Sequence, residues 1–253
     1  MLALHDLHKV YTNFNSFKAE LNTLLAMDGD LEIAQHCIET LGLIEPISHH
    51  YISPDRIQIQ ASNLRESISA SGCVSRNRAV LRVLELVCGS AANIQELSIG
   101  LLEGLTGMAS WMQRHVPGLT PLNTLVEVLT SARHDPEAAA VLASLREQAG
   151  DFDVLLLQDR IAGVGNTEVF LADLRGFVRE GGRVLATFPM AYGQMASLSR
   201  ETDSEPILIP GWEILDQARQ AGFRQASMHL IAAWKFGILA GTLPGVLVLE
   251  LER

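Results

Sequence analysis

Polar residues that directly follow apolar runs are the first places in this sequence where chemistry could occur. The run Val154 to Leu157 ends in the pair Gln158-Asp159, and the run Leu97 to Leu102 ends in Glu103-Gly104. Both runs have the length and composition of buried β-strands. In a parallel sheet ligands bind beyond the carboxyl ends of the strands, so these polar residues are candidates for a ligand site.

Two other groups of residues carry functional side chains, and each allows two interpretations. Residues 63–79 contain three arginines and a glycine, which could bind a carboxylate or phosphate, or could form salt bridges between a cap and the main domain. His49 and His50 suggest a metal site or a general base. No carboxylate or cysteine stands at ligand spacing from them, which favours an ordinary surface loop.

The stretch from residue 152 to 189 predicts a strand, a helix and a second strand. The strands are expected at 154–157 and 184–188, and strands joined by a helix in this way are parallel with a right-handed crossover. Gly181-Gly182 is expected to end the helix. The apolar face of the helix is predicted from four residues: Val169, Ala172, Leu174 and Phe177.

The rest of the chain predicts further α/β units behind a helical amino-terminal region. Apolar residues at helical spacing predict a helix over 76–88, with Ser75 as N-cap and Gly89 after its end. The remaining expectations are helices at 3–27, 31–42, 106–115, 138–148 and 212–221, strands at 97–102, 119–126, 223–232 and 246–250, a short strand around Ile57 and Ile59, a loop at 46–54, and a lid or substrate loop at 191–206. The last two strands are expected to form an antiparallel hairpin.

Composition excludes several classes of function. The chain has 253 residues, is 48% apolar and carries a net charge of -10, which argues against nucleic acid or an anionic membrane as partner. No uninterrupted apolar window is long enough for a membrane span. The amino terminus lacks the apolar core of a signal peptide, and three cysteines without ligand spacing indicate reduced thiols in a cytoplasmic protein.

Three motifs give the sequence a family resemblance. In chain order these are FDVLLLQDRIAGV, VREGGRVLATFPM and GWEILDQARQAGF. They resemble the fourth strand, the Gly-Gly-Arg and fifth strand, and a late helix of class I S-adenosylmethionine (SAM) methyltransferases. The resemblance covers residues 76–253 and implies an α/β fold with a Rossmann-like seven-stranded sheet, preceded by a helical cap over residues 1–75.

A narrower resemblance is to a divergent bacterial branch of methyltransferase-like proteins without a full glycine motif. The segment 83–93, VLELVCGSAAN, superficially resembles a glycine loop, but its helical periodicity favours a helix. The residues that match the divergent branch are Asn63, Arg65 and Glu66, then Arg76, Arg78 and Ala79, and finally Glu103, Thr106 and Trp111.

The resemblance implies a site for SAM and a small-molecule substrate. Glu103, Gly104, Thr106, Asn123, Asp135 and Gln158 are the implied cofactor-binding residues. Asp159, Arg160 and Tyr192 are implied at the reacting group, and Asn63, Arg65, Tyr11 and Tyr51 at the substrate. Tyr11 and the other aromatic residues could equally be packing residues.

Departures from the family pattern leave three functions open. Asn123 stands where an acidic residue usually closes the second strand, and Ala162 and Gly163 stand where an acid and a histidine are common. The first function is methyl transfer to a small molecule. The second is a SAM-consuming cyclase or lyase that releases methylthioadenosine and forms a small cyclic amino acid. The third is a non-catalytic binding module, and a homodimer is also left open.

Overall fold

The computed structural model describes residues 7–26, 57–58, 68–69, 75–89, 94–102, 118–122, 137, 140–141, 143–144, 151–158, 161, 164, 166–200, 207–233, 238 and 243–253. Its centre is a seven-stranded sheet in the order β1-β10-β11-β7-β6-β4-β5. The strands are β1 (Leu7–Tyr11), β4 (Ile99–Leu102), β5 (Leu119–Pro121), β6 (Phe152–Gln158), β7 (Val178–Thr187), β10 (Gln225–Ala232) and β11 (Val246–Glu252). Two short pairs lie outside it, β2 (Ile57–Gln58) with β3 (Ile68–Ser69), and β8 (Leu198–Arg200) with β9 (Ile207–Ile209).

The strand directions confirm the predicted fold class. Strands β5, β4, β6 and β7 are parallel neighbours, while β11 runs antiparallel to both β7 and β10. The expected hairpin of the last two strands is therefore present, and β11 lies between β7 and β10. This is a mixed, Rossmann-like α/β sheet.

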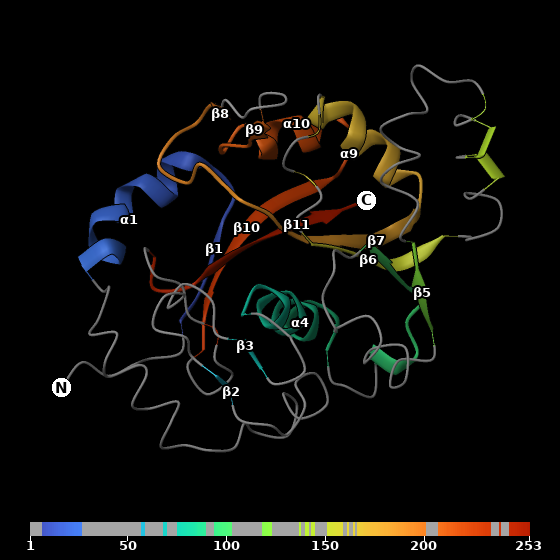
Figure 1. Cartoon of the computed structure of the whole chain (residues 1–253), viewed down its shortest axis with the longest axis horizontal. Helices are drawn as coiled ribbons and strands as arrows, with labels where there is room; N and C mark the ends of the chain where they lie inside the picture. The colour runs from blue at the N-terminus through green and yellow to red at the C-terminus, as the bar shows by residue number, and fades with distance from the viewer. Residues whose placement is uncertain are drawn as a thin grey trace.

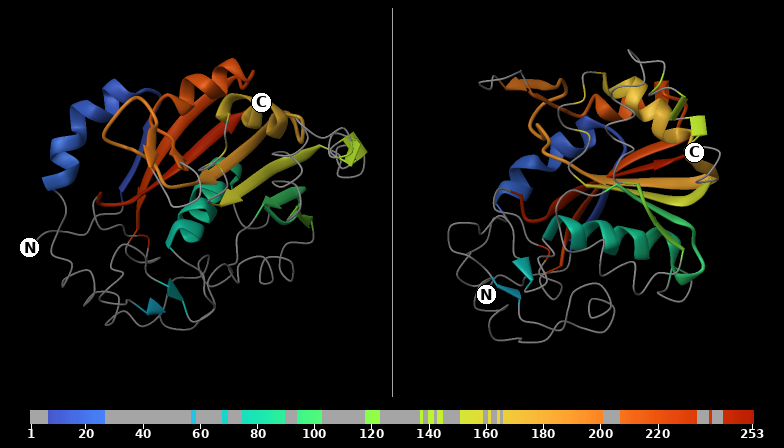
Figure 2. Two further views of the ribbon diagram at one scale, coloured as in Figure 1. Left: turned by 45° about the horizontal axis from the view of Figure 1, so that its top comes forward. Right: turned by 45° about the vertical axis from the view of Figure 1, so that its right-hand side comes forward.

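Helices cover both faces of the sheet. Helix α4 (Ser75–Cys88) lies on one face, and α1 (Phe14–Ala26), α9 (Thr167–Arg175) and α10 (Ile214–Gln220) lie on the other (Figures 1 and 2). Two hydrophobic clusters follow these faces, one under α4 and a larger one that includes Trp212 and residues of α1, α9 and α10. The helix predicted over 76–88 is confirmed as α4, and Gly89 follows its end at φ +92.

The amino-terminal prediction is wrong at its start. Residues 7–11 form β1, which pairs antiparallel with β10, and a helix begins only at Phe14. Burial along the strand alternates, with His8 and Val10 exposed and Tyr11 buried, which is the period of a strand. The seventh strand of the sheet thus comes from the region that the sequence assigned to a helical cap over residues 1–75.

The end of α9 also differs from the prediction. The Asn166 side chain caps its start by accepting from the Val169 amide at 3.1 Å, and the helix ends at Arg175. Val169 is 39% exposed, and the buried face consists of Thr167, Phe170, Leu171 and Leu174. Of the predicted face, Leu174 and Phe177 are buried as expected, whereas Val169 and Ala172 are exposed.

Gly181 and Gly182 belong to β7 and do not end the helix. The pairing of β6 with β7 shifts here, from Phe152 opposite Val178 to Val154 opposite Arg183. A Cβ on Gly182 would lie 2.9 Å from the carbonyl oxygens of Phe152 and Asp153, so only glycine fits the shift. The glycine pair therefore shapes the start of β7.

Several predicted elements lie wholly or partly outside the described residues. These are the helices at 31–42 and 106–115, the loop at 46–54, and most of the helix at 138–148, of which residues 137, 140–141 and 143–144 are helical. The predicted short strand near Ile57 is present as β2.

Candidate functional site

The chain reverses its direction of travel across the sheet between β4 and β6. After β4 the chain forms β5 on one side, and it then forms β6 and β7 on the other side. In open α/β sheets, ligands bind beyond the carboxyl ends of the two strands that flank such a reversal. These ends are level, because Leu102 pairs with Leu157 and the amide of Leu122 donates to the carbonyl of Leu101 at 2.8 Å.

Two buried polar side chains mark this edge. Gln158 ends β6 and Thr187 ends β7, and the two are register partners with exposures of 2% and 1%. Among the described residues, the Thr187 hydroxyl has no hydrogen-bond partner. Leaving a buried hydroxyl unpaired costs about 1–3 kcal/mol. A ligand at this edge could supply the missing partner.

Thr187 was missed in the sequence, whereas Gln158 was among the predicted cofactor-binding residues. The signal for Thr187 was available, since it is the polar residue that ends the apolar run before Phe188. Gln158 closes β6 in the same way. Its role in cofactor binding stays a prediction.

After Thr187, residues 191–197 form a wall that hydrogen bonds attach to the start of α10. The indole Nε1 of Trp212 donates to the carbonyl of Tyr192 at 2.8 Å, and the amide of Glu213 donates to the carbonyl of Met195 at 2.9 Å. The Glu213 carboxylate in turn accepts from the Ser197 amide at 2.9 Å. Residues 191–197 of the predicted lid are thus attached to the start of α10; residues 201–206 lie outside the described part.

This wall borders an open hollow of about 300 Å³ that starts three residues after Thr187. The lining side chains are uncharged: Met190, Ala191, Tyr192, Gly193, Gln194 and Leu198. The ring of Tyr192 lies edge-on to Phe17, with 6.5 Å between ring centres. The hollow suits an uncharged molecule of small size.

Tyr11 lies behind this wall, in an aromatic cluster. It is 4% exposed and makes edge contacts with Phe17 and Trp212. Its hydroxyl donates to Glu20 at 3.0 Å, and burial together with that bond raises its pKa well above the ordinary value. The described contacts of Tyr11 are those of a packing residue.

The other predicted site residues lie outside the described part of the chain. Three of them directly follow described residues at strand ends: Glu103 follows Leu102, Asn123 follows Leu122, and Asp159 follows Gln158. The full set outside the described residues is Glu103, Gly104, Thr106, Asn123, Asp135, Asp159, Arg160, Asn63, Arg65 and Tyr51.

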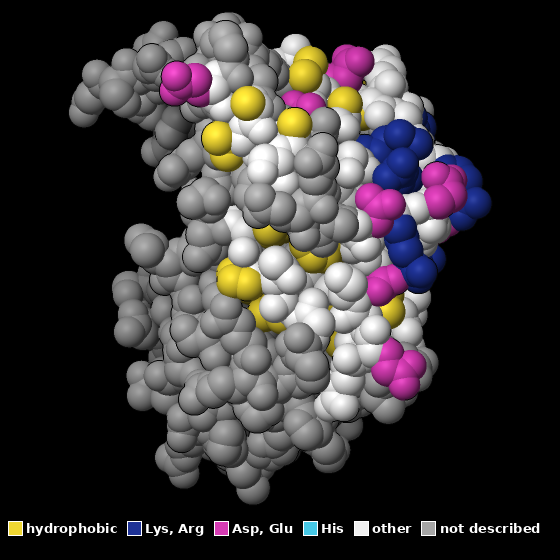
Figure 3. Space-filling view, turned by 90° about the vertical axis from the view of Figure 1, so that its right-hand side faces the viewer, with side chains coloured by type: hydrophobic (Ala, Val, Ile, Leu, Met, Phe, Trp, Pro, Cys, Tyr) yellow, Lys and Arg dark blue, Asp and Glu magenta, His cyan; other side chains and the backbone are white. Residues whose placement is uncertain are grey.

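The described surface carries side chains of both charges. On the face in Figure 3, basic side chains lie beside acidic ones, and ion pairs such as Arg179 with Asp153 are typical of the described surface. No described helix is long and apolar enough to cross a membrane. In the same residues, no group of three or more His, Cys, Asp or Glu is arranged to bind a metal ion.

Comparison with known proteins finds similarity only at the level of solved structures. No protein-family model and no curated protein matches the sequence. The chain is similar to PigF with SAH (15% identity, TM-score 0.34), to an O-methyltransferase family protein from Burkholderia thailandensis (18%, 0.35), and to the N-methyltransferase NodS from Bradyrhizobium japonicum in complex with S-adenosyl-L-homocysteine (13%, 0.32).

Each of these matches covers 70% of this chain. They cover 58% of the first two proteins and 84% of the third, so the chain spans 58% of the length of the first two. At such identities and TM-scores, the chemistry must be argued from the residues of this chain.

Proposed function

We propose that this protein is a SAM-dependent methyltransferase that acts on a small molecule. The observation that carries the proposal is the reversal between β4 and β6, where the buried polar pair Gln158 and Thr187 lies at the carboxyl edge of the parallel strands. The family motifs in the sequence support SAM as the ligand of this edge. The uncharged hollow that starts three residues after Thr187 supports a small, uncharged substrate.

We assign the parts of SAM to the residues that follow these strands in the sequence. Glu103, Gly104 and Thr106, after β4, would hold the amino-acid end. Asn123 and Asp135, after β5, would hold the ribose and adenine, with Gln158 beside them. The assignment rests on the level ends of β4, β5 and β6 and on the unpaired hydroxyl of Thr187.

Methyl transfer makes modest demands on the protein. The reaction is a displacement at carbon, so catalysis consists mainly of aligning the two reactants in a site that excludes water. A fixed wall from Ala191 to Ser197 suits alignment better than a mobile one. Asp159, Arg160 and Tyr192 would surround the transferred group, while Asn63, Arg65 and Tyr51 would contact the substrate.

The test measures binding and product separately. SAM is titrated into the protein by calorimetry, and the nucleoside formed with candidate substrates is then identified by mass spectrometry. We expect saturable binding and adenosylhomocysteine. Methylthioadenosine would instead indicate the cyclase or lyase, and binding without turnover would indicate the non-catalytic module. Absence of saturable SAM binding would refute both the methyltransferase and the SAM-consuming cyclase or lyase, and would leave the non-catalytic module.

A matched pair of variants locates the site. Gln158→Leu should weaken SAM binding about tenfold, the effect of losing one hydrogen bond to a polar ligand. Gln225→Leu changes an exposed glutamine at the start of β10 and should leave SAM binding unchanged. Equal effects from both variants would place SAM elsewhere.

A further inference from the structure

The first turn of α4 contains two buried polar side chains to which no function has been assigned. Asn77 and Arg78 are each 2% exposed. Among the lysines and arginines that the structure describes, Arg78 alone is buried, and such residues are rarely buried in proteins. Arg78 is also one of the three arginines of residues 63–79, for which the sequence left both ligand binding and salt bridging open.

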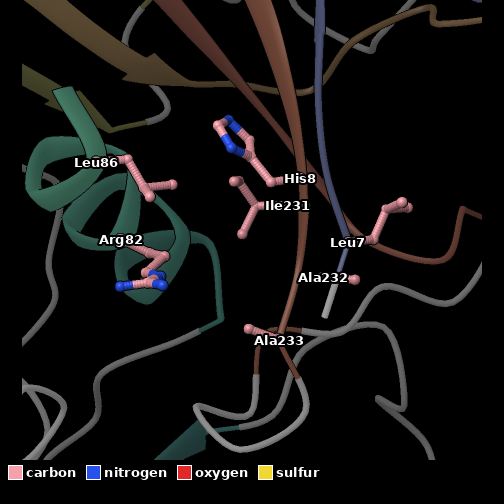
Figure 4. Close-up of a pocket in the computed structure, with 7 residues that line it drawn as sticks. All are labelled: Leu7, His8, Arg82, Leu86, Ile231, Ala232 and Ala233. Atoms are coloured by element: carbon pink, nitrogen blue, oxygen red, sulfur yellow. The ribbon is translucent and has the colours of Figure 1, made fainter. Parts of the chain in front are cut away.

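Helix α4 runs antiparallel to β6 and β7. Near its end, burial raises the pKa of the Cys88 thiol, and the charges of Arg183 and Asp153, near the start of the β6–β7 pairing, also act on it. Earlier in the helix, Arg82 lines a small cavity with Ile231 at the end of β10 (Figure 4). Strands β10 and β7 run in the same direction, because β11 is antiparallel to both. The first turn of α4 therefore lies at the carboxyl edge of the parallel strands.

The polar side chains that end β6 and β7 point to the face of the sheet that α4 covers. Leu156 and Leu185, two residues before Gln158 and Thr187, belong to the hydrophobic cluster under α4. Side chains on a strand alternate between the two faces, so Gln158 and Thr187 share the face of these leucines. The Thr187 hydroxyl, which has no hydrogen-bond partner in the described part of the chain, is thus directed into the layer below α4.

The two buried polar residues of α4 start from the packed side of the helix. Asn77 shares a helix face with Val80, and Arg78 shares one with Leu81, since each pair is three residues apart. Val80 and Leu81 both belong to the cluster under α4. The first turn of a helix carries a positive partial charge, and Arg78 adds a full one. This end of α4 therefore favours an anion, at the same edge and on the same face as Thr187.

The amino-acid end of SAM contains such an anion, because it carries both an ammonium group and a carboxylate. The residues assigned above to this end, Glu103, Gly104 and Thr106, include an acid for the ammonium group but no cation for the carboxylate. A guanidinium can bind a carboxylate through two parallel N–H bonds, and its five donors leave others for contacts within the protein. Arg78 has the charge and the donors that this assignment lacks.

We propose that Arg78 binds the carboxylate of SAM at the first turn of α4. This inference rests on the proposed function, in which SAM is the ligand of this edge and the substrate is uncharged. One guanidinium and one helix terminus match the single charge of a carboxylate. Of the two interpretations that the sequence left open for the arginines of residues 63–79, Arg78 thus has the role in ligand binding.

The test compares the binding of SAM with that of decarboxylated SAM, which lacks only this carboxylate, by calorimetry. The unchanged protein should bind SAM at least about tenfold more tightly, as expected for charge-assisted hydrogen bonds. Arg78→Met should weaken the binding of SAM and leave that of decarboxylated SAM unchanged, so that the preference disappears. If the unchanged protein binds neither form, the proposed function itself is refuted. If it binds both forms equally, SAM binding stands and only the role of Arg78 is refuted.

Two further variants separate the role of Arg78 from effects on folding. Arg82→Met removes an arginine one turn later on α4, where it pairs with Glu85, and should keep the full preference for SAM. Arg78→Lys keeps the charge but cannot form two parallel bonds, so the preference should fall roughly threefold to tenfold. Thermal denaturation shows whether each variant is folded, and Arg78→Lys decides if Arg78→Met does not fold. An undiminished preference for SAM in a folded Arg78 variant contradicts the proposal.

Discussion

At the scale of single residues, removal of the buried Thr187 hydroxyl distinguishes a role in folding from a role in ligand binding. It has no partner among the described residues, so folding gains nothing from it. Thr187→Val should therefore leave the free energy of unfolding unchanged or raise it by up to about 1 kcal/mol. The same change should weaken SAM binding about fivefold to tenfold if the ligand pairs with the hydroxyl.

Urea denaturation and calorimetry of this variant measure the two effects. Thr120→Val is the control, because Thr120 is an exposed threonine on β5, a parallel strand of the same sheet, and lies level with Val184 rather than with Thr187. A loss of stability in Thr187→Val without any loss of SAM affinity would make Thr187 a purely structural residue.

His8 predicts a pH dependence of stability. Its pKa is lowered below the ordinary 6.5, so between the two values the unfolded chain binds more protons than the folded one. The stabilisation is complete above 6.5 and is lost as the pH falls from there to the folded pKa. Solvent screening limits it to roughly 0.5 kcal/mol. His8→Gln should remove this part of the slope in urea denaturation, measured in buffers without carboxylates.

Glu250 affects stability at lower pH. Its carboxylate is 2.7 Å from His229 Nε2, and His229 Nδ1 is in turn 3.0 Å from His8 Nε2. Burial alone would raise its pKa, but the hydrogen bonds from His229 and Arg183 outweigh burial and hold it below the ordinary 4.5. Its stabilisation is present above that value and is lost as the pH falls through the folded pKa. The loss that involves His8 therefore begins at a higher pH, near 6.5, than the loss that involves Glu250, near 4.5.

At the scale of elements, the wall beside the hollow depends on close backbone contact. Gly211 precedes α10, and a Cβ there would lie 2.4 Å from the carbonyl oxygen of Ala196 and 2.5 Å from that of Met195. The hydrogen bonds of Trp212 and Glu213 hold the segment at this distance. The wall can only be built if residue 211 has no side chain.

Gly211→Ala should therefore displace the wall and raise the KM for the substrate more than tenfold, with a stability loss of about 1–3 kcal/mol. Gly193→Ala is the matched control in the same segment, because a Cβ there meets nothing within 4 Å. That control should keep the stability of the unchanged protein, and because Gly193 lines the hollow it serves as a control for stability only. Thermal denaturation of both variants and steady-state kinetics of Gly211→Ala provide the comparison, and an unchanged KM in Gly211→Ala would show that the wall does not contact the substrate.

At the scale of the whole molecule, the amino terminus is part of the main structure. Strand β1 extends the sheet beyond β10, and α1 places Phe17 and Leu24 in the larger hydrophobic cluster beside Trp212. Residues 7–26 thus share a core with the carboxyl-terminal half. We expect them to unfold in one transition with the rest of the sheet.

Two neighbouring leucines of α1 test this expectation. Leu24 is 1% exposed and Leu25 is 38% exposed. Leu24→Ala should lower the global free energy of unfolding by about 2–5 kcal/mol, whereas Leu25→Ala should cost less than about 1 kcal/mol. Denaturation is monitored by tryptophan fluorescence. A separate early transition in Leu24→Ala would instead support an independent cap.

Sequence periodicity was sufficient to predict the helices and strands that are determined by residues close to them in the chain. The helix at 76–88 and the strands that end at Gln158 and Leu102 were predictable, because apolar spacing and caps are local. The order of α/β units also predicted the fold class and the edge at which a ligand would bind. Gln158 could be placed there for the same reason.

Features that depend on contacts between residues far apart in the chain were decided only by the tertiary structure. Residues 7–11 are a strand because β10 offers them an open edge, and a local pattern contains no information about that edge. Position 182 must be glycine because carbonyl oxygens of β6 lie too close for a side chain. The hydrogen-bonded side chains of His8, His229 and Glu250 join residues more than 200 positions apart. Pairing across a sheet brings such residues together, and their spacing in the chain does not encode it.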